Sequence, residues 1–271
     1  MCIRDSNYLV QDIHDLPRII KEAYFIAGTG RPGPVLIDIP KDIQTEKISM
    51  AEYNKLYEVP IHLEGYDPTY KGHQGQIKKA ATLIKNAKRP LIIAGAGVLK
   101  SGAMDELKEL AEKAQIPVTN TLVGLGGFPG DHELALGMVG MHGSVAANNS
   151  TDEADLVIAA GIRFHDRITG HPDFFCKKAK IIHIDIDPAE IDKNVTINVP
   201  IVGDLKQVLT ELNALVEPTT HEAWLEQIRE WQAEYPMVIP ESKNDVLHAQ
   251  YVLSELNKIA KEDAIIVSDV G

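Results

Sequence analysis

Two arginines lie close together in a chain whose charge is otherwise acidic. Arg163 and Arg167 are four residues apart in the segment Gly161–Arg167, which begins where a predicted strand ends. A guanidinium group can bind a phosphate or a carboxylate through two parallel hydrogen bonds, which a lysine cannot do. The segment therefore predicts an anion-binding site. The alternative is a surface salt-bridge cluster that includes Asp166.

Glycines in two other loops would let the backbone approach a ligand closely. Gly95-Ala96-Gly97 follows a predicted strand and precedes a helix, where dinucleotide-binding folds place phosphate groups. The GxGxxG pattern is incomplete because Lys100 stands where its third glycine would be, so a plain strand-to-helix turn is the alternative. Gly140-Met141-His142-Gly143 favours contact with a planar ligand, and its alternative is a polar surface loop.

Carboxylates close two further strands. Asp185 and Asp187 end the segment His183–Pro188, and Gly203-Asp204 follows the next predicted strand. Such carboxylates suit ribose or ribityl hydroxyls, although they can also cap the helix that follows. Because these groups all follow strands of one predicted sheet, they indicate a nucleotide-like cofactor. The residues leave open whether it is FAD, NAD or CoA.

Continuous apolar strands alternate with amphipathic helices from residue 76 to residue 216. Helices are predicted over 76–86, 103–114, 144–149 and 205–216, and strands over 90–94, 117–120, 155–160, 180–186 and 199–202. Ser101 and Asp204 are the predicted caps of two of these helices. Strands that are apolar throughout belong to a parallel sheet covered on both faces. The predicted fold class is α/β, with a central doubly wound, Rossmann-like parallel sheet in three layers.

Partial α/β units flank this sheet. A helix over 16–27, capped by Asp15, and a buried strand over 35–39 form the first, and the strand's neighbours are expected outside the chain. Residues 44–75 and 217–243 are predicted linkers, the second with a helix over 221–234. A helix over 246–260 and a strand over 264–268 begin a third unit. Residues 1–6 lead into no pattern and are interpreted as an artefact.

Composition narrows the classes of partner. Lys plus Arg number 27 and Asp plus Glu number 39, a net charge of −12, which argues against nucleic acid and anionic membranes as partners. Cys2 and Cys176 form no CxxC pair, so no disulfide framework and no metal site is predicted. Apolar runs are too short to cross a bilayer, and no secretory signal pattern is present. A cytoplasmic location is expected.

Together the motifs resemble the acetolactate synthase large subunit, a family of thiamine-diphosphate enzymes. GRPGPVLIDIPKD (30–42) is similar to the end of the family's pyrimidine-binding domain, and SDVG (268–271) to the start of its diphosphate-binding domain. TLVGLGGFPGDH (121–132), GMHG (140–143), GIRFHDRITG (161–170) and HIDIDPAEI (183–191) are similar to its central FAD-binding domain. The resemblance implies a pyrimidine-domain end over 1–43, a central domain over 76–216 and a diphosphate-domain start over 244–271. His165 departs from the family's usual Asp.

The resemblance also implies site residues. Those expected to contact the flavin are Arg31, Gly95, Ala96, Gly97, Thr121, Leu122, Met141, His142, Gly161, Arg163, Arg167, Asp185, Ile186, Gly203 and Asp204. Those expected to line the substrate channel are Lys41, Met141, Asp166 and Arg167, with Arg167 engaging the carboxylate of the second 2-ketoacid. The family's catalytic Glu and its GDG metal-binding motif match no segment of the chain. The isolated chain is therefore expected to be inactive and to hold no metal.

The family reaction implied is decarboxylation of pyruvate on thiamine diphosphate with Mg²⁺, followed by transfer to pyruvate or 2-ketobutyrate. This serves branched-chain amino-acid biosynthesis, with FAD in a structural role. The implied assembly is a homodimer or homotetramer, with or without a regulatory small subunit. Alternatives within the superfamily are glyoxylate carboligase, pyruvate oxidase and oxalyl-CoA decarboxylase, against which GMHG and RFxDR argue. Two alternatives lie outside the superfamily. One is a sirtuin-type deacylase, which needs a CxxC…CxxC module, and the other is a stand-alone nucleotide-binding module such as an electron-transfer flavoprotein subunit.

Overall fold

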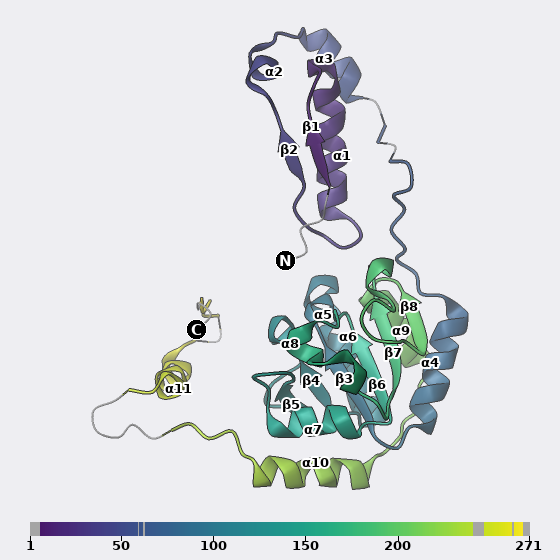
Figure 1. Ribbon diagram of the computed structural model, residues 1–271, viewed down its shortest axis with the longest axis vertical. Coiled ribbons are helices and arrows are strands. Elements are labelled where there is room, and N and C mark those ends of the chain that lie inside the picture. The colour runs from purple at the N-terminus through teal and green to yellow at the C-terminus, as the bar shows by residue number, and fades with distance from the viewer. Residues whose placement is uncertain (1–5, 59, 62, 241–246, 262, 268–271) are drawn as a thin grey trace.

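The centre of the protein is a parallel sheet of six strands (Figure 1). The computed structural model describes residues 6–58, 60–61, 63–240, 247–261 and 263–267. The strands are β3 (Pro90–Ala94), β4 (Val118–Asn120), β5 (Ala135–Met138), β6 (Leu156–Ala160), β7 (Lys180–Asp185) and β8 (Val199–Val202). Their order across the sheet is β5-β4-β3-β6-β7-β8, and every neighbouring pair is parallel.

Helices cover both faces of this sheet because its strands are apolar on both sides. Ile92 and Ala94 of β3 pack into one core, and Leu91 and Ile93 pack into a second core on the opposite face. The first face carries α4 (Gln74–Asn86), α5 (Ala96–Ser101), α6 (Met104–Ala114) and α9 (Leu205–Leu215). The second carries α7 (Val145–Glu153) and α10 (Glu222–Glu234). The predicted α/β fold with three layers is confirmed.

The strand order creates a crevice at one edge of the sheet. The first three central strands run outward from β3 to β5, and the chain then returns to build β6, β7 and β8 on the other side of β3. Because of this reversal, the connections that leave β3 and β6 run in opposite directions. In open α/β sheets ligands bind outside the carboxyl ends of the strands at such a switch point. The loops after Ala94 and Ala160 therefore border the expected site.

In the central domain one local prediction was wrong, one strand was not predicted and one prediction was confirmed. Ser101 does not cap the helix after it, because it is the last residue of α5 and its hydroxyl donates back to the Gly97 carbonyl at 2.7 Å, while Gly102 at a φ of +63° ends α5. Strand β5 was not predicted, since its four residues include a glycine and are only partly buried. Asp204 caps α9 as predicted, accepting a hydrogen bond from the Gln207 amide at 3.1 Å.

An N-terminal unit precedes the central domain. It contains β1 (Asn7–Leu9), η1 (Ile13–Asp15), α1 (Leu16–Gly28), β2 (Leu36–Asp38), α2 (Lys41–Thr45) and α3 (Met50–Tyr57). Strand β1, which was not predicted, pairs with β2 in parallel. Because β2 has this one partner in the described residues, Leu36 is 67% exposed and the prediction of a buried strand was wrong. Val10, Ile13, Ile19 and Ile43 form a small core of their own.

Helix boundaries in this unit also differ from those predicted. The Asp15 carboxylate does not cap α1 but accepts a hydrogen bond from Arg18 at 2.9 Å. Helix α3 lies within the predicted linker over 44–75. Its capping box, formed by Ser49 and Glu52, is a local sequence signal for this helix, which is too short to show sustained hydrophobic periodicity.

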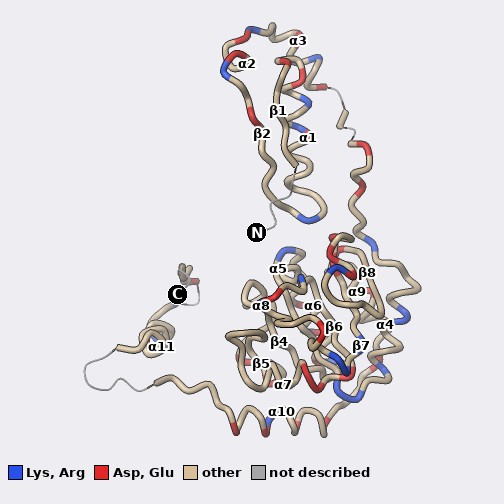
Figure 2. Tube along the Cα trace, in the orientation of Figure 1, with Lys and Arg blue, Asp and Glu red and all other residues tan. Residues whose placement is uncertain are grey.

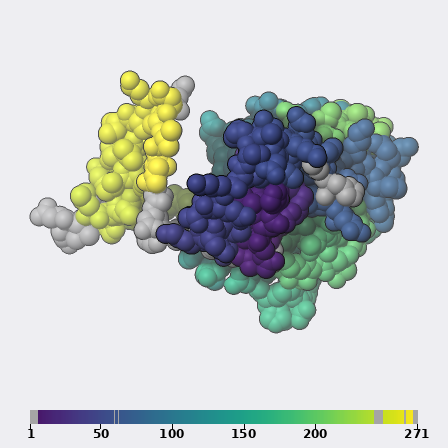
Figure 3. All heavy atoms as spheres, turned by 90° about the horizontal axis from the view of Figure 1, so that it is seen from above, coloured from purple at the N-terminus to yellow at the C-terminus, as the bar shows by residue number. Residues whose placement is uncertain are grey.

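The C-terminal part contains a docked helix and a separate one. Helix α10, predicted within a linker, packs against the central domain, and its Trp224 indole donates to the Pro90 carbonyl at 3.0 Å. Helix α11 (Ala249–Ile259) has no buried residue and lies apart from the rest (Figure 3). The strand predicted over 264–268 does not form over 264–267, where no neighbouring strand pairs with it. Residues 1–5, 241–246 and 268–271 lie outside the described residues, and with them SDVG and all but Ser6 of the expected artefact over 1–6.

Charges of both signs are interspersed along the described chain (Figure 2). Helices of the described residues are all too short or too polar to cross a bilayer.

Candidate functional site

A cavity of about 580 Å³ lies at the switch point of the sheet. The N-terminal unit contributes the loop after α1 to its wall, and the central domain contributes the loops after β3, β4, β6, β7 and β8. Nine of the predicted cofactor residues line it: Arg31, Ala96, Gly97, Thr121, Gly161, Arg163, Asp185, Ile186 and Asp204. Residues that lie far apart in the sequence are thus brought to one place, as the predicted sheet topology requires.

The glycines after β3 and β6 meet backbone to backbone. The Gly97 amide donates to the Gly161 carbonyl at 3.0 Å. A Cβ added at Gly97 would lie 2.5 Å from the Gly161 Cα, and one added at Gly161 would lie 2.6 Å from the Gly97 Cα. Gly161 also has a φ of +61°, which a side chain disfavours. These glycines shape the floor of the cavity and leave backbone exposed to its occupant.

Thr121 provides a buried polar group that lacks a protein partner. It directly follows β4, is 3% exposed, and its Oγ1 forms no hydrogen bond with any described residue. Buried hydroxyls in native proteins are nearly always satisfied, so such a group beside a cavity points to a ligand. The next residue, Leu122, begins η2 (Leu122–Gly124), is 63% exposed and is not part of the lining.

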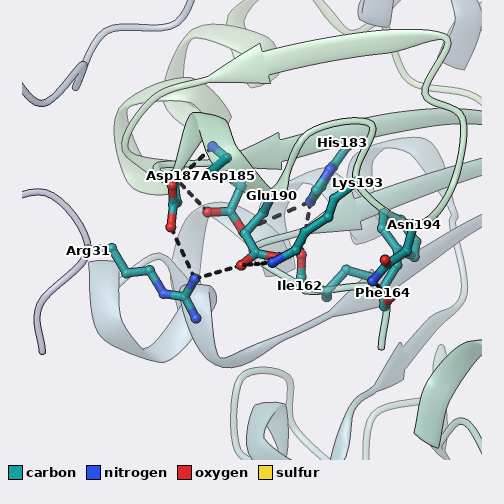
Figure 4. A network of polar contacts seen from close by, with 10 residues as sticks. Arg31, Ile162, Phe164, His183, Asp185, Asp187, Glu190, Lys193 and Asn194 are labelled. Carbon is teal, nitrogen blue, oxygen red and sulfur yellow. Dashed lines mark hydrogen bonds and ion pairs between the residues drawn. The ribbon is translucent and has the colours of Figure 1, made fainter. Parts of the chain in front are cut away.

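Arg31 reaches from the N-terminal unit to the end of β7 (Figure 4). One of its guanidinium nitrogens lies 3.2 Å from the Asp187 carboxylate and 3.1 Å from that of Glu190, in η4 (Pro188–Glu190). Burial alone would lower the pKa of Arg31, but the hydrogen bonds to these two carboxylates outweigh it and raise that pKa. Arg31 is therefore a permanent positive charge at the cavity wall.

Asp185 is a further buried carboxylate at the end of β7. It is 9% exposed, and its Oδ1 accepts a hydrogen bond from the Asp187 amide at 2.9 Å. Burial is the main cause that raises the pKa of Asp185 to about 6, against the opposing effects of that hydrogen bond and of Arg31.

His183 lies behind Asp185 in the sheet. Burial lowers the pKa of its imidazole, so the ring is neutral and its Nε2 donates to the Ile162 carbonyl at 2.9 Å. The contact of 3.9 Å between His183 and Asp185 is consequently not an ion pair at neutral pH.

A second group of predicted residues lies outside the cavity lining. The Met141 amide donates to the Arg167 carbonyl at 3.2 Å, so the loop 140–143 adjoins α8 (Asp166–Thr169). Gly140, at a φ of +106°, leaves no space for a Cβ against that same carbonyl. The side chains of Asp166 and Arg167 are 82% and 71% exposed and 3.8 Å apart, which fits the surface-pair alternative in this structure.

The remaining predicted residues are placed as follows. Gly95 lies beside the lining residues, and His142 belongs to the loop beside α8. Gly203 packs against the segment before α4, because a Cβ there would lie 2.9 Å from the Gly72 nitrogen. Lys41 begins α2 of the N-terminal unit and is exposed.

Several lining residues were not predicted. Tyr70 comes from the predicted linker, Lys100 and Ser101 come from α5, and His165 comes from the loop after β6. Lys100 and Ser101 lie within about one helical turn of Gly97, so their spacing from that glycine was a usable signal. Tyr70 carries no local signal. In the described part of the chain, no cluster of three or more His, Cys, Asp or Glu side chains has the arrangement of a metal site.

The strand order, the switch-point cavity and the glycine turns define a doubly wound α/β domain with a candidate ligand site at its switch point. Comparison with known families agrees: the model of "Thiamine pyrophosphate enzyme, central domain" matches residues 77–212, half of the chain. The chain therefore belongs to the thiamine pyrophosphate enzyme family.

Curated proteins similar to this chain carry the name of the same subunit, the large subunit of acetolactate synthase. The chain is 43% identical, over 98% of its length, to the acetolactate synthase large subunit of Buchnera aphidicola from Schizaphis graminum, of which it covers 46%. It is 48% identical, over its whole length, to the "Probable acetolactate synthase large subunit" of Methanocaldococcus jannaschii, of which it covers 47%. It is 40% identical, over 98% of its length, to the acetolactate synthase isozyme 3 large subunit of Escherichia coli, of which it covers 47%. The chain spans about half the length of these relatives.

Proposed function

We propose that the chain forms the central part of an acetolactate synthase large subunit and that its switch-point cavity binds FAD. The observation that carries this proposal is the cavity itself, which nine of the residues expected to contact flavin line together. The similarity to large subunits over nearly the whole chain supports the enzyme class.

The residues present fit a dinucleotide cofactor. The glycine turns after β3 and β6 let backbone approach it, Arg163 offers charge-assisted hydrogen bonds to phosphate, and Asp185 and Asp204 offer acceptors for hydroxyls. The unsatisfied Thr121 hydroxyl would gain a partner. FAD would have a structural role, without net oxidation or reduction.

The whole protein would act on 2-ketoacids with thiamine diphosphate and Mg²⁺. Pyruvate would be decarboxylated, and the remaining two-carbon group would join a second 2-ketoacid, either pyruvate or 2-ketobutyrate. The role proposed for this chain is to bind FAD and to orient the 2-ketoacid substrate. The Arg167 guanidinium, 71% exposed and 3.8 Å from Asp166, would engage the substrate carboxylate. Met141 and Asp166 would lie beside it in the proposed channel, which Lys41 would complete from the N-terminal unit.

We further propose that the central domain, expected over 76–216, extends through α10. Trp224 and Ile228 of this helix are buried in one of the two central cores, so residues 222–234 are not a free linker. The relatives are named large subunits, and association of the complete protein with a small subunit and with copies of itself is proposed on that basis. Light scattering of the complete protein with and without a small subunit tests this assembly.

Replacing Thr121 tests the cofactor proposal most directly. Thr121→Val keeps the shape but removes a hydroxyl that has no partner in the protein, so it should not lower stability. It should weaken FAD binding about 5- to 10-fold, the effect of one hydrogen bond. Titration of FAD fluorescence with the 271-residue chain measures the affinity, and chemical unfolding measures stability.

Thr119→Val, two residues earlier on β4, is the matched control. Its hydroxyl already donates to the Gly137 carbonyl at 3.0 Å, so this variant should lose stability and keep its FAD affinity. Equal FAD affinities for Thr121→Val and the parent chain would refute the proposed contact. A complete protein that forms no acetolactate from pyruvate would refute the enzyme assignment.

A further inference from the structure

Two tyrosines of the segment before α4 hold the turn that ends α1. The Tyr70 hydroxyl accepts a hydrogen bond from the Gly30 amide at 2.9 Å. The Tyr66 hydroxyl donates to the Thr29 carbonyl at 3.1 Å and lies 3.0 Å from the Thr29 Oγ1. The ring of Tyr66 also packs edge-on against Phe25 of α1, with centroids 6.0 Å apart. We call Tyr66 and Tyr70 the tyrosine clamp.

The same segment is fixed to the central domain. The Asp204 amide donates to the Tyr70 carbonyl at 2.7 Å. A Cβ on Gly203 would lie 2.9 Å from the Gly72 nitrogen and 3.0 Å from the Tyr70 oxygen, so backbone packs directly on backbone here. A Cβ on Gly72 would in turn approach side chains of β8, α9 and α4 within 3.0 Å. Tyr70 therefore joins the end of β8 to the turn after α1.

The clamped turn carries Arg31, which follows Gly30 directly. Gly30 has a φ of +59° and directly precedes Arg31, so rotation at Gly30 would redirect the Arg31 side chain, whereas Pro32 and Pro34 already restrict the rest of the turn. Ordering such a turn costs conformational entropy, and contacts that hold it beforehand remove that cost from ligand binding. With the clamp in place, Arg31 reaches Asp187 and Glu190 at the cavity wall.

We propose that the tyrosine clamp positions Arg31 at the wall of the switch-point cavity for a phosphate-bearing cofactor. Tyr66 and Tyr70 act through the turn, although Tyr70 also lines the cavity, and Arg31 carries the positive charge that faces the ligand. This inference rests on the cofactor site proposed above and assigns a positioning role to both tyrosines. Its cause is tertiary, because Tyr70 and Gly30 are 40 residues apart.

The test removes each hydroxyl alone. In Tyr70→Phe, exchange of the Gly30 amide with solvent, followed by NMR on the 271-residue chain, should quicken about 5-fold, because the amide loses one hydrogen bond. FAD affinity of the same variant should fall about 3- to 10-fold, with Tyr66→Phe showing a similar loss. Tyr24→Phe is the matched control, since Tyr24 lies on α1 and is 83% exposed, and it should leave both quantities unchanged.

A double-variant comparison separates positioning from a general effect on structure. If the clamp acts through Arg31, Tyr70→Phe should lower FAD affinity in the parent chain but not in Arg31→Ala. Additive losses of affinity would overturn the inference, as would unchanged Gly30 exchange in Tyr70→Phe. If no chain binds FAD, the proposed function fails. Faster exchange in Tyr70→Phe, absent in Tyr24→Phe, would then still support the clamp and its hold on the turn.

Discussion

Replacing Asp185 with asparagine should change how the stability of the protein depends on pH. The carboxyl group is 9% exposed, and its pKa is raised from 3.8 to about 6 mainly by burial. Between these values the folded chain keeps a proton that the unfolded chain has lost, so wild-type stability falls as pH rises. Well above pH 6 the carboxylate is charged in both the folded and the unfolded chain, and the loss of stability has reached its full size.

The size of the effect follows from the two pKa values. A rise of the pKa from 3.8 to about 6 corresponds to a penalty on the order of 3 kcal/mol for holding the charged group in the folded state. About 2 kcal/mol of this develops between pH 4.5 and pH 7.5. The asparagine side chain would be neutral at every pH, and its amide oxygen can still accept from the Asp187 amide. Asp185→Asn should therefore gain about 2 kcal/mol relative to wild type across that range.

Urea unfolding of both chains at pH 4.5, 5.5, 6.5 and 7.5 measures the difference. Asp131→Asn, which changes an exposed carboxylate in the loop before β5, is the matched control and should leave the pH dependence of stability as it is. A difference between Asp185→Asn and wild type that is the same at every pH would refute the reasoning. So would a difference that moves in favour of wild type as pH rises, because the attraction to Arg31 would then outweigh burial.

Three other changes test the packing around the site and the sheet. Gly97→Ala should cost about 1–3 kcal/mol of unfolding free energy, because its Cβ would meet the Gly161 backbone, whereas Gly130→Ala has open space and should be nearly neutral; urea unfolding compares them. Trp224→Phe should cost about 1–3 kcal/mol because the Pro90 carbonyl loses its donor, and a loss no larger than that of half-buried Trp231→Phe would contradict this. Burial raises the pKa of the Cys176 thiol, so in a Cys2→Ser background it should react with a thiol reagent only upon unfolding; rapid labelling of the folded chain would disprove its burial.

Strands with continuous apolar runs were the elements that sequence patterns predicted best. Strands β3, β6 and β7 lie where those runs were found, because each is covered on both faces and both faces must be apolar. Strand β8 was also predicted, although it lies at one edge and packs Val199 and Ile201 into one core. Strand β5 lies at the sheet edge and is partly exposed, so its pattern was too weak to recognise. Strand β1 is three residues long, and its pairing with β2 depends on residues almost 30 positions away.

The cavity residues also divide into those that sequence patterns predicted and those that they did not. Glycines and carboxylates at strand ends were recognisable because a parallel sheet brings all its carboxyl ends to one edge, whatever the details of packing. The sequence did not predict whether a given residue faces the cavity, another loop or solvent. Gly203 and Arg167 are two examples. Both follow strands, yet one packs under Gly72 and the other points to the surface.

The sequence by itself determined the α/β class, the run of alternating strands and helices, and the edge of the sheet where a ligand would bind. These depend on local hydrophobic periodicity and on turn residues, which each segment carries independently. Only the tertiary structure decided that Arg31 pairs with Asp187 and Glu190, more than 150 residues away, and that Tyr70 holds the turn beside it. Such contacts leave no local sequence pattern, because they form only when segments that are far apart in the sequence dock against one another.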